Sequence, residues 1–182
     1  CAVGCNYLDI VPDNVATLDH AFTDRNSAEK YLATIYSYQP YFGFTDSDPS
    51  IAATDEWYFL YDHYLAQSRY AYEMAVQMGR QDVSSPYYNY WSGSNGGRGL
   101  FVALRDCNTF LENIDKVNAT LDDETREKWI GEVYFFKAFY HFYLLRLYGP
   151  IPIIRENIPI SASVEEVRTF RDPVEDVVNY IV

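Results

Sequence analysis

The most regular pattern of apolar and polar positions in this chain lies between residues 129 and 148. Apolar or aromatic side chains recur there in steps of three and four, at Trp129, Val133, Phe136, Tyr140, Tyr143 and Leu147. This spacing places them on one face of an α-helix. A second, partly apolar face carries Tyr134, Ala138, His141 and Leu145. Because a helix that is apolar nearly all round must be covered on several sides, we predict a central helix of an all-α protein.

Both ends of this helix carry recognisable signals. Asp122-Asp123-Glu124 supplies a capping side chain and an acidic first turn, which suits the positive end of the helix dipole. At the other end, Gly149 favours termination and Pro150 cannot continue the helix. The central helix is therefore bounded on both sides by the sequence itself.

A second amphipathic helix is expected over residues 100–117. Its buried side would carry Leu100, Ala103, Leu104, Cys107, Phe110, Leu111 and Ile114. The connection to the central helix is too short for anything but antiparallel neighbours, so the two should form a helical hairpin. Helix pairs of this length fit stacked repeats, but the sequence shows no clear self-similarity with a period of about 34 residues.

Weaker patterns predict helices ahead of this hairpin. Asp24 or Asn26 can cap a helix over residues 27–38. Helical patterns also cover residues 51–64 and 71–78. The chain is thus expected to be helical over most of its length.

The C-terminal residues predict one more helix. Asp172 and Pro173 would be its cap and its first position. An apolar stripe would follow at Val174, Val177, Val178 and Ile181.

Residues 79–99 lack a helical pattern and form the longest expected loop. Gly93–Gly99 is rich in glycine, but it has no Lys-Ser or Lys-Thr and no expected strand precedes it. We therefore interpret it as a flexible loop and not as a phosphate-binding one. Loops of this length in compact domains are usually functional or disordered.

The composition narrows the possible functions. The 182 residues carry a net charge of −12 and no cluster of Lys or Arg, which argues against binding to nucleic acids or anionic lipid headgroups. No stretch approaches the roughly 18 consecutive apolar residues of a transmembrane helix. Aromatic residues make up 18% of the chain, and 18 residues are Tyr, a side chain that suits both cores and semi-wet grooves.

Motifs for catalysis and metal binding are missing from the sequence. His20, His63 and His141 are far apart and lack the spacing of a metal site. No Gly-x-Ser-x-Gly sequence and no Cys–His pairing indicates a nucleophile. We therefore expect no enzymatic activity, no cofactor and no metal.

Three segments of the chain follow one another as in a known family. They are Cys5–Asp13, Leu104–Ile114 and the aromatic helix Gly131–Ile154, which ends in an Arg-Leu-Tyr-Gly turn. Together they resemble the SusD/RagB-type outer-membrane lipoproteins of Bacteroidetes. The resemblance implies a stack of tetratricopeptide-like helical hairpins with long loops. It also implies that residues 21–182 are the N-terminal helical domain of a longer protein.

The same resemblance makes residues 1–20 a lipoprotein N-terminus and tether. The small residues Ala2-Val3-Gly4 precede Cys5, as they precede the acylated Cys of bacterial lipoproteins. Cys5 is therefore the expected lipid-bearing residue, with Cys1 as the alternative. An acylated Cys would anchor the protein to the outer membrane at the cell surface without a spanning segment.

In function, the resemblance implies a protein that captures an oligosaccharide and delivers it unchanged to a SusC-like TonB-dependent transporter. Two alternatives stay open. The chain could capture peptides, as RagB-like proteins are associated with peptide uptake, or it could be a helical scaffold that docks a partner protein and binds no small ligand.

Aromatic and amide side chains on loops are the candidates for ligand contact. Sugar rings stack on Trp and Tyr, and sugar hydroxyls need amide or guanidinium partners. The candidates are Trp57, Tyr58, Tyr61, Tyr87, Tyr88, Asn95 and Arg98. Each could instead pack in the core, as aromatic clusters more often do. Trp91 resembles a framework aromatic of the family, so we expect it in the core.

Overall fold

The computed structural model describes residues 18–43, 48–52, 54–55, 70–117 and 121–182. In this part of the chain the regular structure is helical, and the only β-type pairings are two isolated bridges, Asn89–Ser94 and Ile151–Asp172. The predicted all-α fold is confirmed. The helices, in chain order, are α1 (Leu18–Ala21), α2 (Arg25–Ser37), α3 (Pro49–Ala52), α5 (Ala71–Gln77), α6 (Leu100–Asn113), η3 (Ile114–Lys116), α7 (Asp123–Tyr148), α8 (Val164–Val167) and α9 (Val174–Ile181).

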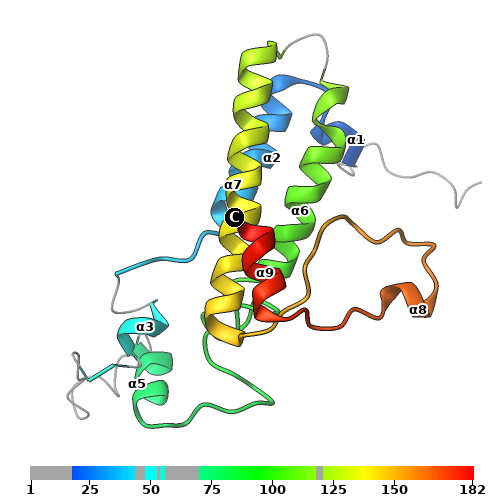
Figure 1. Cartoon of the computed structure of the whole chain (residues 1–182). Coiled ribbons are helices and arrows are strands. Elements are labelled where there is room, and N and C mark those ends of the chain that lie inside the picture. Colours follow the sequence, from blue (N-terminus) through cyan, green and yellow to red (C-terminus); the bar gives the residue numbers. More distant parts are fainter. Residues whose placement is uncertain (1–17, 44–47, 53, 56–69, 118–120) are drawn as a thin grey trace, which may run out of the picture.

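The long helix α7 forms the axis of the molecule (Figure 1). It packs along α6 as an antiparallel hairpin, and α2 packs against both. On the other side, α9 packs against the C-terminal half of α7, while the short helices α3 and α5 contact one another beside its C-terminal end. The predicted hairpin of α6 and α7 is therefore present.

The helix boundaries follow the capping signals closely. The Asp122 carboxylate accepts the backbone N–H of Thr125 at 2.8 Å and caps α7. Gly149, with φ +68°, ends α7 in a backbone conformation that favours glycine. Asp24, and not Asn26, caps α2 by accepting the N–H of Ser27 at 3.0 Å.

Other expectations about the helices were incomplete or wrong. The last turn expected over residues 100–117 is a short 3₁₀ helix, and the short helices α1 and α8 were not predicted. Asp172 does not cap α9; its carboxylate accepts the N–H of Ile153 at 2.8 Å, and the cap position falls on Pro173. Of residues 51–64, only the start is described, as the end of α3.

The main core lies between α2, α6 and α7. Its largest side chains include Ile35 from α2, Leu104 and Phe110 from α6, and Tyr140 and Tyr143 from α7, all buried. Tyr31 of α2 and Tyr38, which caps the C-terminal end of α2, donate hydroxyl hydrogen bonds to the Asp106 carboxylate of α6 at 3.4 and 2.9 Å. Apolar packing and these cross-helix contacts hold α2 against the hairpin.

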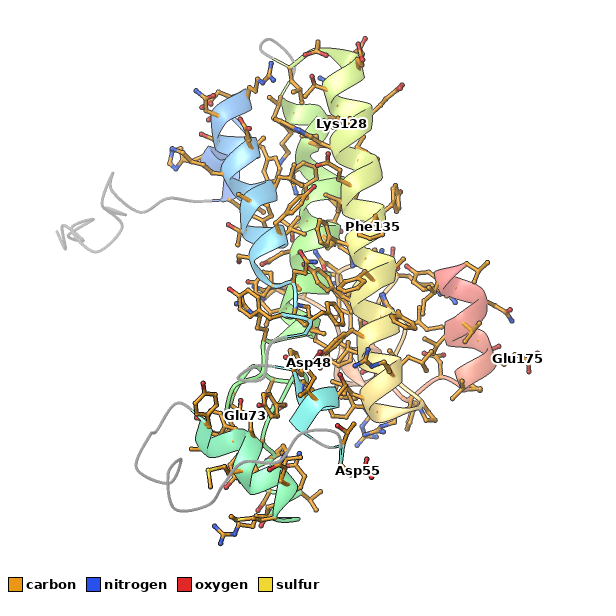
Figure 2. All side chains as sticks on the ribbon, turned by 90° about the vertical axis from the view of Figure 1, so that its left-hand side faces the viewer. Asp48, Asp55, Glu73, Lys128, Phe135 and Glu175 are labelled. Carbon is orange, nitrogen blue, oxygen red and sulfur yellow. The ribbon has the colours of Figure 1, made fainter. Side chains whose placement is uncertain are left out.

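The prediction that α7 is covered on several sides is only partly correct. Trp129, Val133 and Phe136 are buried as expected. In contrast, Tyr134, Phe142 and Phe135, which is labelled in Figure 2, are 58%, 47% and 63% exposed. Among the described residues, α7 thus keeps one open aromatic face.

Two buried polar side chains of α7 fix the chain that follows it. His141 Nδ1 donates to the Lys137 carbonyl at 2.7 Å, and its Nε2 accepts the N–H of Ile154 at 3.1 Å. Lys137 Nζ donates to the Arg155 carbonyl at 2.6 Å. The chain then makes an excursion through α8 and returns at the Ile151–Asp172 bridge. This return brings residue 171 back beside the end of α7.

Candidate functional site

The loop of residues 79–99 has a defined fold built on backbone hydrogen bonds. Tyr88 N donates to the Asn95 carbonyl at 2.8 Å, and Asn89 N donates to the Ser94 carbonyl at 3.1 Å. An ideal Cβ at Gly97 would lie only 2.2 Å from the carbonyl carbon of Asn89, so this close approach requires glycine. The expected flexible loop is instead held by close backbone contacts.

Asn89 organises the centre of this loop. Its side-chain oxygen accepts the N–H groups of Trp91 and Ser92, both at 3.1 Å. Its amide nitrogen donates to the hydroxyls of Ser92 and Ser94 at 2.7 and 3.1 Å. An Asn side chain that bonds to nearby backbone N–H groups stabilises a turn, here the one that presents Trp91.

A groove of about 570 Å³ lies where this loop meets the end of α7. Its walls include Gln81, Ser84, Asn89, Trp91, Tyr148 and Arg171. These side chains come from the loop, from the last residue of α7 and from the segment ahead of α9. The groove therefore depends on the return of the chain at residues 171 and 172.

Trp91 is the largest apolar side chain in the groove. It is half-buried, with its ring centroid 4.6 Å from that of Phe101 and 5.4 Å from that of Tyr148. The Arg171 guanidinium lies over the Trp91 ring, 5.0 Å from its centroid. Trp91 thus packs against the core, as expected, and also lines the groove.

Tyr148 and Arg171 of the groove form hydrogen bonds with the backbone around the end of α7. The Tyr148 hydroxyl accepts the N–H of Tyr90 at 3.0 Å, and burial raises the pKa of this phenol above its usual value. Arg171 Nη1 donates to the carbonyls of Tyr148 and Pro150 at 3.4 and 3.3 Å. Hydrogen bonds therefore link the end of α7 both to the loop of residues 79–99 and to Arg171.

One acidic side chain, Asp82, also lines the groove. Its carboxylate accepts the hydroxyl and backbone N–H of Ser84 at 2.6 and 2.7 Å. These hydrogen bonds lower the pKa of Asp82, so the group is ionised at neutral pH. The Asp82 carboxylate is thus hydrogen-bonded within its own loop.

The four predicted contact residues that the structure describes lie around this loop, not together in one site. Tyr87 packs against Tyr72 of α5, with ring centroids 5.6 Å apart. Tyr88 is buried, and its hydroxyl donates to the Glu73 carboxylate. Asn95 donates to the Ser85 hydroxyl and the Pro86 carbonyl, both at 3.1 Å.

Arg98, the fourth of these residues, faces α2. Its guanidinium donates to the Ser37 carbonyl and lies 4.8 Å from the ring centroid of Tyr41. In this arrangement all four residues support the loop, and their role in ligand contact stays a prediction. The other predicted site residues, Cys5, Trp57, Tyr58 and Tyr61, lie outside the described residues.

Sequence reasoning missed Gln81, Tyr148 and Arg171 as groove residues. Gln81 holds the loop, since its amide donates to the Tyr87 carbonyl and accepts the Tyr87 N–H at 3.1 and 2.7 Å. Arg171 is distant in sequence and reaches the groove only through the tertiary fold. No local pattern could have associated it with Trp91.

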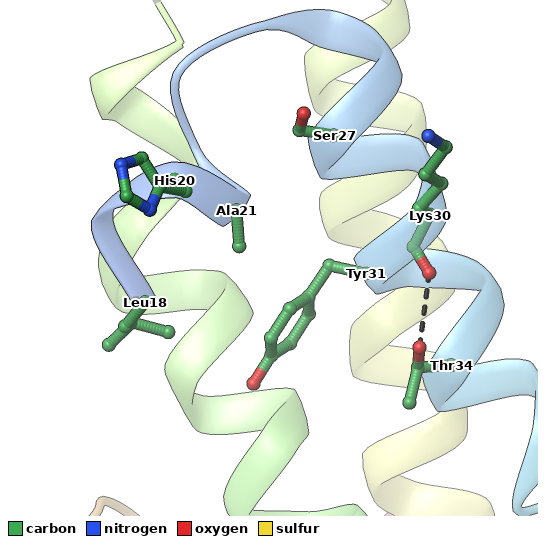
Figure 3. Close-up of a pocket in the computed structure, with 7 residues that line it drawn as sticks. All are labelled: Leu18, His20, Ala21, Ser27, Lys30, Tyr31 and Thr34. Atoms are coloured by element: carbon green, nitrogen blue, oxygen red, sulfur yellow. Dashed lines mark hydrogen bonds between the residues drawn. The ribbon is translucent and has the colours of Figure 1, made fainter. Parts of the chain in front are cut away.

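Two further hollows have no tryptophan in their lining. One, of about 570 Å³, lies between α1 and α2 and includes Leu18, His20, Lys30 and Tyr31 (Figure 3). Within it, the Thr34 hydroxyl donates to the Lys30 carbonyl at 3.1 Å. Another, of about 440 Å³, lies between α6 and residues 153–158. The loop groove differs from both in that its lining includes a tryptophan, Trp91.

No helix in the described ranges is long and apolar enough to cross a bilayer. In the same ranges, no group of three or more His, Cys, Asp or Glu side chains is arranged to hold a metal ion.

Comparison with known proteins gives one family. Residues 6–182 match a SusD-like family described as "Starch-binding associating with outer membrane". No curated protein matches the chain.

Two solved structures share the fold. A SusD-like protein from Bacteroides fragilis NCTC 9343 is 20% identical, with a TM-score of 0.61 over 93% of this chain and 29% of its own. A protein named BT4246 is 25% identical, with a TM-score of 0.67 over 88% of this chain and 25% of its own. The chain thus spans between a quarter and a third of the length of these proteins.

Proposed function

This chain belongs to the SusD-like family, and from that premise we propose that it captures an oligosaccharide at the cell surface. The family is one of glycan-binding proteins associated with the outer membrane. Capture would involve no chemical change to the sugar. The bound oligosaccharide would pass to a SusC-like TonB-dependent transporter, and a lipid on Cys5 would anchor the protein to the outer membrane.

The groove beside Trp91 is the observation that carries this proposal. A sugar ring has apolar faces that pack on an aromatic ring, and its hydroxyls need hydrogen-bond partners close by. The lining of the groove combines the Trp91 indole with Gln81, Ser84 and the Arg171 guanidinium. Its volume of about 570 Å³ lies within the usual range of small-ligand pockets, about 300–1,000 Å³.

Binding to a panel of oligosaccharides tests the proposal directly. We expect calorimetry with the purified full-length protein to show heat of binding for at least one glycan. Trp91→Ala should weaken that binding, because it removes the aromatic wall of the groove. Tyr134→Ala is the matched control, since Tyr134 is an exposed aromatic of α7 and does not line the groove. Circular dichroism confirms that each variant is folded.

The outcomes separate the alternatives. Binding to peptides with no binding to any glycan would favour the RagB-like alternative. Loss of transporter association after changes on the open face of α7, with no ligand of either kind bound, would favour a scaffold.

Anchoring through Cys5 has its own test. Cys5→Ala should release the protein from the outer-membrane fraction of cells, whereas Cys1→Ala should not. The reverse pattern would assign the lipid to Cys1.

A further inference from the structure

We propose that Arg171 makes the groove selective for sugars that carry a carboxylate group, such as uronic acids. This inference rests on the proposed function, because it names the class of sugar that the Trp91 groove would capture. It follows from the hydrogen bonds and the position of the guanidinium, and from the chemistry that a guanidinium recognises.

The groove carries one charge of each sign. Asp82 and Arg171 are its two charged wall residues. One oxygen of the Asp82 carboxylate, Oδ1, accepts both the hydroxyl and the N–H of Ser84. Arg171, by contrast, forms no ion pair with any residue that the structure describes. Its hydrogen bonds to protein are two long ones to carbonyls, both from Nη1.

The Arg171 guanidinium lies in the wall of the groove, beside the proposed sugar position. It lies over the Trp91 ring, 5.0 Å from the ring centroid, so a sugar that packs at this ring comes within its reach. A guanidinium offers a rigid fork of N–H donors that matches the two oxygens of a carboxylate. A neutral sugar hydroxyl accepts a single hydrogen bond from the same group and lacks the attraction between opposite charges. A carboxylated sugar therefore gains more from Arg171 than its neutral counterpart.

The acidic character of the whole chain does not cancel this effect. The net charge of −12 repels anions at long range, but salt screens such repulsion beyond about 8 Å at physiological ionic strength. A contact with the guanidinium acts at hydrogen-bond distance, where screening is weak. Selectivity is thus set locally, by the groove.

The test compares glycans that differ only in their carboxylates. Oligogalacturonides and their methyl esters form one pair, and xylo-oligosaccharides that carry glucuronic acid or its methyl ester form another. We expect calorimetry to show tighter binding of the carboxylated member of at least one pair. Arg171→Gln should reduce the ratio of the two affinities by roughly tenfold or more, the factor that corresponds to one charge-assisted hydrogen bond.

Two further variants keep the test decisive. Arg168→Gln removes the same charge from an exposed residue of the α8 excursion outside the groove, and it should leave the ratio unchanged. Arg171→Lys keeps the charge but loses the planar fork, so it should reduce the ratio by less than Arg171→Gln. If Arg171→Gln does not fold, Arg171→Lys serves as the test variant in its place.

Each result supports or overturns the inference. Equal binding of both members of every pair, or a ratio that Arg171→Gln does not change, overturns the role of Arg171 while glycan capture stands. No binding of any glycan by the folded protein contradicts both glycan capture and the role of Arg171. A preference for the carboxylated sugar that is lost on changing Arg171, but not Arg168, supports the inference.

Discussion

At the scale of single residues, the loop that builds the groove depends on one glycine. A Cβ at Gly97 would lie 2.2–2.6 Å from the backbone of Asn89, which cannot move without breaking the turn that presents Trp91. We expect Gly97→Ala to lower the free energy of unfolding by about 1–3 kcal/mol, the usual cost of overpacking. Urea denaturation measures this change.

Gly131→Ala is the matched control for this substitution. Gly131 lies within α7, and a Cβ there would meet no atom within 4 Å. Because Ala favours the helix more than Gly does, this variant should be more stable by about 1 kcal/mol. Equal effects of the two substitutions would show that the contact with Asn89 is not tight.

His141 gives the fold a pH dependence with a defined sign. Burial lowers its pKa from 6.5 to about 4, and the nearby charges of Lys137 and Arg155 act in the same direction, against one opposing hydrogen bond to the Lys137 carbonyl. Between these two pH values the unfolded chain binds a proton that the folded chain does not. The free energy of unfolding should therefore fall from pH 6.5 towards pH 4, by at most about 1.4 kcal/mol per pH unit.

Urea denaturation between pH 6.5 and 5 measures this slope. That window lies above the range of Asp24, Asp48, Asp82, Asp122 and Glu166, whose pKa values are all lowered. His141→Gln cannot titrate, so its curve should be flatter. Parallel curves for the two proteins would assign the slope to another group.

At the scale of elements, the caps determine where helices start. Asp122 accepts the N–H and the hydroxyl of Thr125, both at 2.8 Å, ahead of the longest helix. Asp122→Ala should lower Tm by roughly 2–4 °C, because a helix N–H loses its partner. Asp122→Asn keeps a capping oxygen and should retain most of that stability. If both variants melted alike, the negative charge and not the cap would be the stabilising feature.

Helices were predictable from the sequence where their determinants are local. The periodicity of α7, its cap at Asp122 and its end at Gly149 all lie within the segment that they define. Asp172 was misassigned because its carboxylate bonds to Ile153, a contact that only the tertiary fold creates. The groove was hidden for the same reason, since Trp91 and Arg171 meet only after α7 and its return segment have folded.

At the scale of the whole molecule, the open face of α7 shows that an apolar position in the sequence pattern need not be buried in the fold. Periodicity placed aromatic residues around most of the helix, but the described neighbours cover only part of it. Phe135 is 63% exposed, whereas the adjacent Phe136 is 4% exposed and packs against Tyr36 and Tyr140. Two neighbouring residues of the same type therefore have different roles, one in stability and one at the surface.

Substitution of these two phenylalanines distinguishes the roles. Phe136→Ala should lower the free energy of unfolding by about 3–5 kcal/mol, because it leaves a cavity between α2 and α7. Phe135→Ala should change stability little, but it should reduce the binding of a hydrophobic dye, since Phe135 forms part of an exposed apolar surface with Tyr134 and Phe142. Urea denaturation and dye fluorescence measure the two effects. A large loss of stability in Phe135→Ala, comparable with that of Phe136→Ala, would show that this face of α7 is covered in the folded protein in solution.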